Sequence, residues 1–263
     1  MVATEREVDR GRTHRSPRYV VVIGGASGIG AATATLLADA DYRVVIADRD
    51  IDAAEGLAGT IMGASAAFLD VRDAANVEEF FSGLAGSGGN LAGVVHCPAI
   101  GQTRSFLDIE RADWDAQMAV NLRGAFLVCR QAGRMMKEQG NGSIVLLSSV
   151  AAQRPSYSGS VYASSKAALE HLVKCLAQEL GAAGVRVNAV APGATETPLV
   201  QKLHTAETRA ALTARIPLGR YGETGEIAQA IRYLLSDDAQ FVTAQLLYVD
   251  GGMSIPNYLP ERS

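Results

Sequence analysis

The sequence lacks the long apolar runs, the basic excess and the leader segment that mark several protein classes. No apolar run approaches the roughly 18 to 20 residues that a membrane-spanning helix requires. The first 18 residues mix five arginines with three acids and contain no apolar core of a secretory signal, so we expect a flexible arm on a cytoplasmic protein. Lys and Arg (24) do not outnumber Asp and Glu (28), so neither nucleic acid nor a membrane is an expected partner.

Cysteine is also scarce. Cys97, Cys129 and Cys175 show no CxxC spacing and lie in apolar segments, so we expect buried thiols of a reducing compartment and no metal site. Hydrophobic residues make up 48% of the chain and charged residues 20%, which is typical of a soluble globular protein. Because no repeat or linker follows residue 18, we predict an N-terminal arm over 1–18 and a single domain over 19–263.

What the sequence does contain is a regular alternation of short apolar runs and longer segments with helical spacing. The apolar runs cover 19–25, 43–49, 64–71, 91–97, 142–149, 185–193 and 245–252. Helices are expected at 28–40, 51–62, 73–85, 111–138, 160–181 and 224–236. Because most runs are apolar on both faces and are joined by helix-length connections, the pattern predicts an α/β fold. We expect a Rossmann-like, doubly wound, seven-stranded parallel sheet with helices on both faces.

A glycine cluster joins the first apolar run to the first helix. Gly24, Gly28 and Gly30 allow a tight turn, a close approach of main-chain N–H groups to a pyrophosphate, and close packing of the helix on the strand. The helix N-terminus then faces the anion. Asp48 ends the next run, 18 residues after Gly30, where a carboxylate can accept hydrogen bonds from ribose hydroxyls. Together these residues predict a dinucleotide site.

The acid at the end of the second run also bears on the choice of dinucleotide. Asp48 would repel a 2′-phosphate, so we expect NAD rather than NADP. Arg49 keeps the other choice open, because a guanidinium can pair with that phosphate. Asp50 is expected to cap the following helix instead. Asp70, at the end of the third run, is expected beside the adenine.

Several motifs in the same order resemble the short-chain dehydrogenase/reductase family, in its compact single-domain branch, from about residue 18 to 254. They are the glycine turn, Asp70-Val71, Asn121, Ser149, Tyr162-x3-Lys166, "NAVAPGATETP" at 188–198 and "VDGGMS" at 249–254. The resemblance implies an NAD(P)-dependent oxidoreductase acting on CH–OH groups. Its catalytic tetrad would be Asn121, Ser149, Tyr162 and Lys166. Its cofactor contacts would be Gly24, Ser27, Gly28, Ile29, Gly30, Asp48, Arg49, Asp70, Val71, Cys97, Ala99, Tyr162, Lys166, Pro192, Gly193, Thr195 and Thr197.

The residue types of this tetrad suit hydride transfer, in which a proton leaves or joins the substrate oxygen. Tyr162 is the expected acid/base, but a free tyrosine has a pKa of about 10 and needs a nearby cation to favour the phenolate. Lys166, one helical turn away, would supply that cation. Ser149 would hold the substrate oxygen, and the Asn121 side chain would hold a water that links the lysine to solvent.

One motif departs from the family. The usual "NNAG" after the fourth run is His96-Cys97-Pro98-Ala99 here. Ala99 adds a methyl group near the expected cofactor ribose, and Pro98 removes an N–H donor. We expect His96 to be a packed, hydrogen-bonded histidine at the strand end rather than a catalytic base.

Residues 195–222 occupy the position of the family's substrate lid. For the substrate region, we expect an apolar inner face of the lid from Leu199, Leu203 and Leu212, and candidate anion contacts from Arg215 and Arg220. Beyond Ser149, Gln153, Arg154 and Tyr157 are also expected near the substrate, with Tyr157 as a wall of the pocket. They suit a small molecule, cyclic or open-chain, that bears a secondary alcohol or a ketone.

The family resemblance also implies a homotetramer built through the helices that carry Asn121 and Tyr162 and through the C-terminal strand. Two other functions stay open. One is an NADPH-dependent 3-oxoacyl thioester reductase, which "GRYGETGEIA" at 219–228 also resembles. The other is a non-catalytic NAD-sensing protein, which would be expected to lose the tyrosine or the lysine that this chain retains.

Overall fold

Seven strands form one parallel sheet in the computed structural model, which describes residues 18–40, 42–86 and 89–256. The strands are β1 (Arg18–Ile23), β2 (Arg43–Asp48), β3 (Ser65–Phe68), β4 (Asn90–His96), β5 (Gly142–Leu147), β6 (Val185–Pro192) and β7 (Leu246–Val249). Their order is β3-β2-β1-β4-β5-β6-β7, and each neighbouring pair is parallel. The prediction of a doubly wound, seven-stranded parallel sheet is confirmed. The predicted arm lies outside the described residues except for Arg18, which begins β1.

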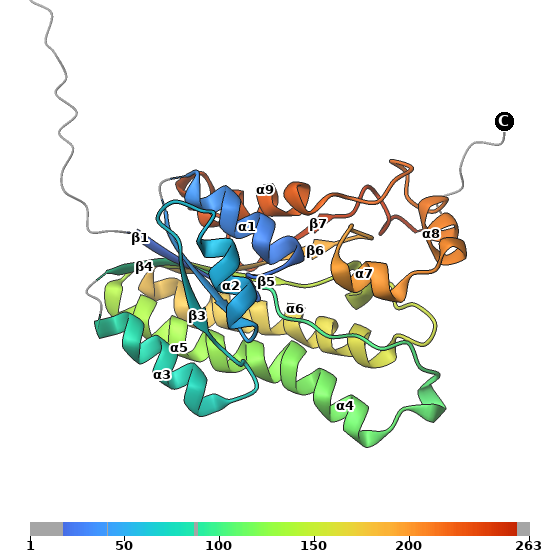
Figure 1. Cartoon of the computed structure of the whole chain (residues 1–263), viewed down its shortest axis with the longest axis horizontal. Helices are drawn as coiled ribbons and strands as arrows, with labels where there is room; N and C mark the ends of the chain where they lie inside the picture. The colour runs from blue at the N-terminus through green and yellow to red at the C-terminus, as the bar shows by residue number, and fades with distance from the viewer. Residues whose placement is uncertain (1–17, 41, 87–88, 257–263) are drawn as a thin grey trace, which may run out of the picture.

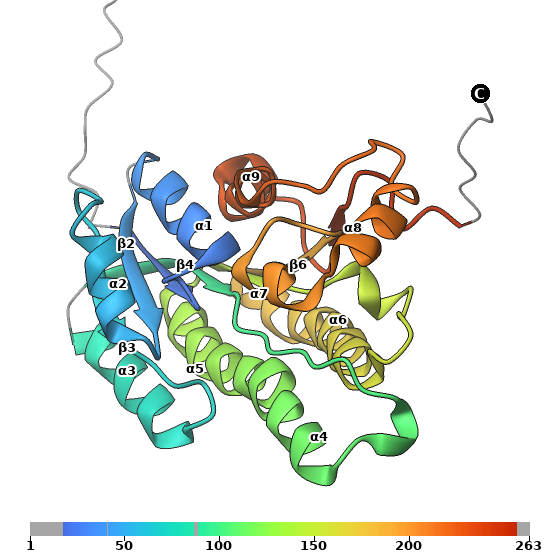
Figure 2. The ribbon, with the colours of Figure 1, turned by 45° about the vertical axis from the view of Figure 1, so that its right-hand side comes forward.

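Helices cover both faces of this sheet (Figure 1; Figure 2). Helices α1 and α9, with α2 beside them, pack on one face, and α3, α5 and α6 pack on the other. The interiors of β1, β2, β4, β5 and β6 are almost completely buried between the two layers, which explains their runs of Val, Ile, Leu and Ala. The helices are α1 (Gly28–Ala38), α2 (Ile51–Ala58), α3 (Ala74–Gly86), α4 (Arg111–Met118), α5 (Gly124–Gln139), α6 (Ser160–Leu180), α7 (Pro198–Leu203), α8 (Ala206–Thr213) and α9 (Thr224–Leu235).

Two helical features differ from the sequence prediction. The helix expected at 111–138 is interrupted by a π-helical turn, η2 (Ala119–Arg123), between α4 and α5. A π turn is a local feature that often accompanies a functional site, and the hydrophobic period does not reveal it. In the expected lid, the structure forms the short helices α7 and α8, which are capped by the hydroxyls of Thr197 and Thr205.

The chain reverses its direction of winding between β1 and β4. The connection after β1 leads through α1 on one face to β2, and the connection after β4 leads through α5 on the other face to β5, so a crevice opens between the carboxyl ends of β1 and β4. Ligands of doubly wound folds bind in the crevice at this switch point. The glycine turn, the end of β4 and the lid all lie at this edge of the sheet.

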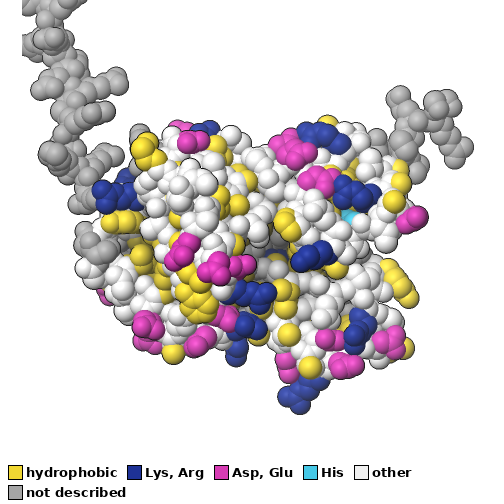
Figure 3. Space-filling view, viewed as in Figure 1, with side chains coloured by type: hydrophobic (Ala, Val, Ile, Leu, Met, Phe, Trp, Pro, Cys, Tyr) yellow, Lys and Arg dark blue, Asp and Glu magenta, His cyan; other side chains and the backbone are white. Residues whose placement is uncertain are grey.

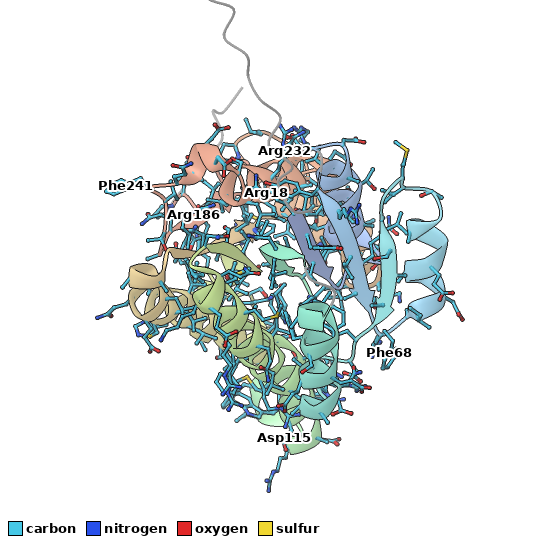
Figure 4. All side chains as sticks on the ribbon, turned by 90° about the vertical axis from the view of Figure 1, so that its left-hand side faces the viewer. Arg18, Phe68, Asp115, Arg186, Arg232 and Phe241 are labelled. Carbon is cyan, nitrogen blue, oxygen red and sulfur yellow. The ribbon has the colours of Figure 1, made fainter. Side chains whose placement is uncertain are left out.

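The opposite edge is held by arginine. The Arg186 guanidinium in β6 donates to the main-chain oxygens of Leu234 (2.6 Å), Leu235 (3.3 Å) and Ser236 (3.2 Å). These carbonyls at the C-terminal end of α9 lack intrahelical partners and attract a cation. Figure 4 shows Arg186 and Arg18 at the same edge of the sheet. The C-terminal end of α9 is therefore fixed beside the amino end of β6.

The cysteines differ in exposure. Cys129 is buried in α5, and Cys97 is partly buried after β4, whereas Cys175 is exposed on α6, so the expectation of three buried thiols is wrong for Cys175. The run around Cys175 is apolar only on the helix face that packs on the sheet, and this side chain lies off that face. None of the helices in the described chain combines the length and apolarity that a membrane crossing needs.

Candidate active site

A cavity of about 510 Å³ opens at the carboxyl ends of the strands. Its volume is in the range of small-molecule and cofactor sites. Figure 3 shows this face of the molecule hollowed near its middle, with basic side chains at the rim. All of the residues predicted to contact the cofactor line the cavity, and so does Ser149. Asn121 does not line it, although its neighbour Val120 does.

The glycine turn forms one wall of the cavity. Gly24 has φ +69°, a left-handed conformation that favours glycine. A Cβ on Gly30 would lie 2.1 Å from the Gly24 carbonyl oxygen, so only glycine allows α1 to start this close to β1. Gly28, the first residue of α1, faces the start of the lid, since its Cβ would lie 3.5 Å from Pro198 Cδ. The N-terminus of α1 therefore opens into the cavity, as the motif predicts.

Asp48 is fixed beside this turn. Its carboxylate accepts hydrogen bonds from Ala26 N and Asp50 N, both at 3.1 Å. A carboxylate has about four acceptor positions, so these two bonds leave capacity for ribose hydroxyls. Arg49 lines the same end of the cavity. Asp50 accepts from Ala53 N (3.1 Å) and caps α2, which confirms its predicted role.

Asp70 has a partner that the motif search missed. Arg72 Nε and Nη2 bind its carboxylate at 2.9 to 3.1 Å and 2.5 Å, and this side-chain hydrogen bonding holds the pKa of Asp70 below its usual value. Both side chains line the cavity at the end expected for the adenine. The only sequence signal was an arginine two residues after the motif acid, which is too common to single out.

Tyr162 lies on the first turn of α6 and faces the cavity across from the lid. A Cβ on Gly101 would lie 3.4 Å from Tyr162 Cδ2 and 4.0 Å from Leu203 Cδ1, so the tyrosine ring and helix α7 enclose Gly101. Burial raises the pKa of Tyr162, and a hydrogen bond with the Ser149 side chain opposes the rise. Ser149 Oγ also accepts from Ala151 N (3.1 Å), which orients the serine toward the tyrosine.

Lys166 is 1% exposed, one turn along α6 from Tyr162. Its Nζ donates to Leu147 O at 2.6 Å and lies 5.7 Å from the centre of the Tyr162 ring. Burial lowers the pKa of Lys166 to about 8. The sequence predicts that the Lys166 charge lowers the pKa of Tyr162. In the protein without cofactor the effect of burial is larger, because it raises the pKa of Tyr162 and lowers the pKa of Lys166.

Asn121 holds the architecture around this pair. Its Oδ1 accepts from Ile100 N (2.8 Å), and its Nδ2 donates to Ile100 O (2.9 Å) and to Ser165 Oγ (3.1 Å). The side chain is fully buried. These three bonds tie the loop after β4 to α6, and the expectation that the side chain also holds a water stays a prediction. Both amide hydrogens have protein acceptors, and Oδ1 keeps a second acceptor position that a water could use.

His96 confirms one half of its prediction. It is 1% exposed and packed at the end of β4, but its Nε2 has no hydrogen-bond partner among the described residues. Burial, with a further contribution from the Lys166 charge, lowers the pKa of His96 to about 3. The ring is therefore neutral at physiological pH. Pro98 of the same motif packs on Gly24, whose Cβ would lie 3.0 Å from Pro98 N.

The lid carries a chain of polar contacts that the sequence did not indicate. His204 Nδ1 and Tyr221 Oη lie 2.9 Å apart, the Arg209 guanidinium lies 4.5 Å from the Tyr221 ring centre, and Arg209 pairs with Glu196. Tyr221 is buried with Ile216 and connects the lid to the end of β6. His204 lines the cavity. A single histidine in a predicted loop gives no signal for such a contact.

The side chains expected around the substrate lie partly in the cavity and partly outside it. The predicted apolar face of the lid is confirmed, since Leu199, Leu203 and Leu212 line the cavity. Tyr157 is 91% exposed, so its prediction as a wall is wrong, because the loop turns it toward solvent. Arg220 pairs with Glu226 on α9 (2.6 Å) instead of facing the cavity.

The two threonines after β6 shape the entrance to the lid. Thr195 Oγ1 donates to Gly193 O (3.1 Å), and Thr197 Oγ1 accepts from Val200 N (3.2 Å) at the start of α7. Both line the cavity with Pro192. Within the described residues, no group of three or more His, Cys, Asp or Glu side chains is arranged to hold a metal ion.

Comparisons with known proteins cover nearly the whole chain. A family model described as "Enoyl-(Acyl carrier protein) reductase" matches residues 24–254. The 3-oxoacyl-[acyl-carrier-protein] reductase FabG of Thermotoga maritima is 37% identical over 245 residues, 90% of this chain and 98% of that protein. The cis-4-hydroxycyclohexanecarboxylate dehydrogenase of Sinomonas cyclohexanicum is 38% identical over 240 residues, 89% of this chain and 96% of that protein. A crystal structure of a gluconate 5-dehydrogenase from Burkholderia cenocepacia, in complex with NADP and tartrate, matches with a TM-score of 0.86 and 31% identity over 91% of this chain and 96% of that one.

Proposed function

Because the chain belongs to the short-chain dehydrogenase/reductase family, we propose that it transfers a hydride between NAD and a secondary alcohol or ketone on a small molecule, cyclic or open-chain. The observation that carries the proposal is the meeting of Tyr162, Ser149 and the glycine turn in one cavity. The family relationship makes the chain an oxidoreductase with a nicotinamide cofactor. The substrate and the choice between NAD and NADP are our inference.

The cavity residues fit a dinucleotide. Gly30 lets α1 begin close to β1, where a side chain would collide with Gly24 O, so the N-terminus of α1 lies where the motif binds a pyrophosphate. The first N–H groups of α1 lack intrahelical acceptors and favour an anion. Asp48 and the Asp70–Arg72 pair would hold the adenosine half. Thr197 and the backbone at Pro192–Gly193 would hold the nicotinamide half.

The proposed mechanism assigns the proton to Tyr162. A bound nicotinamide would supply the hydride acceptor for oxidation of the alcohol, and its oxidised form would add a positive charge to the site. Ser149 Oγ holds the substrate oxygen beside Tyr162 Oη, and Tyr162 takes the hydroxyl proton during oxidation or returns it during reduction. The burial that raises the pKa of Tyr162 favours its neutral, proton-donating form. The tyrosine of the protein alone is therefore prepared for ketone reduction.

Lys166 and Asn121 have supporting roles in this mechanism. With a pKa lowered to about 8, Lys166 can exchange a proton near neutral pH, which suits a relay between Tyr162 and solvent. Leu147 O fixes the position of its amine at 2.6 Å. Asn121 is a positioning residue, since its bonds to Ile100 and Ser165 hold the loop and the helix that enclose the tyrosine.

Asp48 supports NAD as the preferred cofactor. Its carboxylate is fixed by two main-chain N–H groups, so moving it away from a 2′-phosphate would break both bonds. Arg49 at the same end of the cavity supports the alternative, and the gluconate 5-dehydrogenase structure contains NADP. We propose NAD because the fixed carboxylate and an added phosphate would repel each other at close range.

The substrate proposal follows the cavity walls. Leu199, Leu203 and Leu212 give the lid an apolar inner face that suits a compact carbon skeleton. The relationship to cis-4-hydroxycyclohexanecarboxylate dehydrogenase supports a cyclic one. The relationship to FabG supports the second candidate, an NADPH-dependent 3-oxoacyl thioester reductase, which Asp48 disfavours. A non-catalytic NAD sensor is disfavoured because Tyr162 and Lys166 are both retained.

We also propose a single catalytic domain over 19–263 that acts as a cytoplasmic homotetramer. Large apolar side chains are exposed on and before α4 and on α5, as at Leu107 (90%) and Phe126 (48%). Phe241, before β7, is fully exposed and projects away from the body of the protein (Figure 4). Patches of this kind are typical of interfaces between copies. A monomeric mass in solution would contradict the tetramer.

The experiment that tests the proposed function is a cofactor and substrate screen. Purified protein is assayed with NAD(H) and NADP(H) against secondary alcohols, their ketones and 3-oxoacyl thioesters, with absorbance at 340 nm as the readout. The proposal expects turnover of a small alcohol–ketone pair with a higher kcat/KM for NAD(H). A preference for NADPH and acyl-carrier thioesters would establish the second candidate instead.

A further inference from the structure

The substrate half of the cavity combines apolar walls with a guanidinium that lies apart from Lys166. The walls come from the lid and from the loops after β5 and β7, and they include Val150, Leu199, Val200, Leu203, Leu212 and Met253. Arg154 lines the same cavity, five residues after Ser149. An arginine in such surroundings needs an explanation, because an apolar wall would suit an uncharged alcohol better than a guanidinium does.

Of the three guanidinium nitrogens of Arg154, Nη1 makes the hydrogen bonds to the protein. Nη1 donates to Met253 O at 3.1 Å and to Ile255 O at 2.5 Å, which fixes the side chain to the turn after β7. Nε and Nη2 have no acceptor among the described residues. These two nitrogens form the edge of a guanidinium that binds a carboxylate in a bidentate manner. The bonds from Nη1 therefore orient the group and leave its binding edge available.

No acidic side chain of the described chain neutralises Arg154. The nearby Asp250 carboxylate accepts from Gly252 N (2.9 Å) and Ser254 N (2.7 Å) within its own turn. Among the described residues that line the cavity, the carboxylates are Asp48 and Asp70, both at the adenosine end. The substrate half therefore has a net positive charge.

We propose that Arg154 binds a carboxylate of the substrate, so that the substrate is a hydroxy or oxo carboxylic acid with a compact apolar skeleton. The inference rests on the proposed function for the reacting carbon, and it adds the second group that the enzyme recognises. Tyr162 and Ser149 bind the reacting oxygen at one end of the molecule. Arg154 binds the carboxylate at the other end, and the leucines of the lid cover the carbons between them.

The first test compares matched substrates. Open-chain and cyclic oxo acids of four to eight carbons are reduced beside their primary amides, which have similar shape and no charge. A charge-assisted bidentate contact predicts that kcat/KM for the best acid exceeds that of its amide by about 10- to 100-fold in the wild-type protein. Equal kcat/KM values for acids and amides would overturn the proposal.

Variants assign the selectivity to one residue. Arg154→Gln removes the charge and is expected to reduce kcat/KM for the acid by about 10- to 100-fold and to leave the amide within about threefold. Arg154→Lys keeps the charge without the planar fork and should recover part of the loss. Arg215→Gln is the matched control, since Arg215 is an exposed cation of the lid region that does not line the cavity. Equal losses for acid and amide in Arg154→Gln would show a structural clamp and overturn the proposal.

A binding measurement separates this inference from the proposed reaction. Cyclohexanecarboxylate and cyclohexanecarboxamide are titrated calorimetrically into the wild-type protein and both glutamine variants in the presence of NADH, which brings no positive ring charge. Tighter binding of the carboxylate, lost only in Arg154→Gln, would support the anion site even if no alcohol or ketone is turned over. Weak, equal binding of both probes to all three proteins would overturn it, whatever the outcome of the activity screen.

Discussion

Lys166 is a buried cation whose burial should reduce the stability of the protein. Its pKa falls from the ordinary value of 10.5 to about 8, which corresponds to a penalty of about 3 kcal/mol on the charged form. The substitution Lys166→Met keeps an unbranched side chain that is one heavy atom shorter and removes the charge. Removing the charge removes this penalty, but losing the hydrogen bond to Leu147 O costs about 1 to 3 kcal/mol and offsets part of the gain in stability. We expect Lys166→Met to stabilise the nucleotide-free protein by about 1 to 2 kcal/mol at pH 7.

The pH dependence identifies the cause. An unfolded lysine keeps its proton up to about pH 10.5, whereas the folded Lys166 loses it near pH 8. The penalty is therefore fully present below pH 8 and disappears as the pH approaches 10.5. The stability of the wild type should rise relative to Lys166→Met across this interval, so that the advantage of the variant fades.

Urea denaturation at a fixed protein concentration, followed by circular dichroism at pH 7, 9 and 10, measures both effects. Lys174→Met is the matched control, since Lys174 is exposed two turns further along α6 and should change stability by less than about 0.5 kcal/mol. A Lys166→Met protein that is less stable than the wild type at pH 7, or an advantage that stays constant with pH, would refute the reasoning. The variant should also lose turnover with the best substrate, as expected for a residue kept for function at the expense of stability.

Two further predictions concern the cofactor end of the cavity. Gly30→Ala places a methyl group against Gly24 O and should weaken dinucleotide binding, measured by NADH fluorescence titration, by at least about tenfold, with about 1 to 3 kcal/mol of destabilisation. Gly56→Ala in α2, where a Cβ meets no atom within 4 Å, should leave binding unchanged, and equal effects of the two would contradict this account. Asp48→Ser removes the carboxylate beside Arg49 and should move the kcat/KM ratio toward NADP by at least about tenfold; an unchanged ratio would show that Asp48 does not select the cofactor.

The sheet and its flanking helices could be predicted because local patterns reflect their burial. The central strands are apolar on both faces and lie between two helical layers, as in Val20–Val22 of β1. Gly24 and Gly30 could be identified because their backbone geometry allows no other residue. The spacing of Tyr162 and Lys166 predicted neighbours on one face of α6, and the structure places them there.

What escaped prediction depends on contacts between distant segments. A π turn interrupts the helix expected at 111–138, and the Asn121 amide binds Ile100 and Ser165. Both features follow from packing against the loop after β4. The pairing of Arg72 with Asp70 depends on the backbone of the turn after β3, which the sequence pattern does not specify. The direction of an exposed loop is set by its backbone, so composition alone misplaced Tyr157.

The central claim is that Tyr162 transfers the proton in a nucleotide-dependent oxidation or reduction. Its most direct test is the kcat of Tyr162→Phe with the best substrate of the screen, measured beside the affinity of this variant for NADH. The substitution removes only the hydroxyl at the cavity and leaves the ring in place against Gly101. The account predicts a fall in kcat of about 10²- to 10⁴-fold with NADH affinity within about threefold. Tyr157→Phe, at an exposed tyrosine five residues earlier, should leave both quantities unchanged. Turnover that survives in Tyr162→Phe would contradict the assignment of this residue.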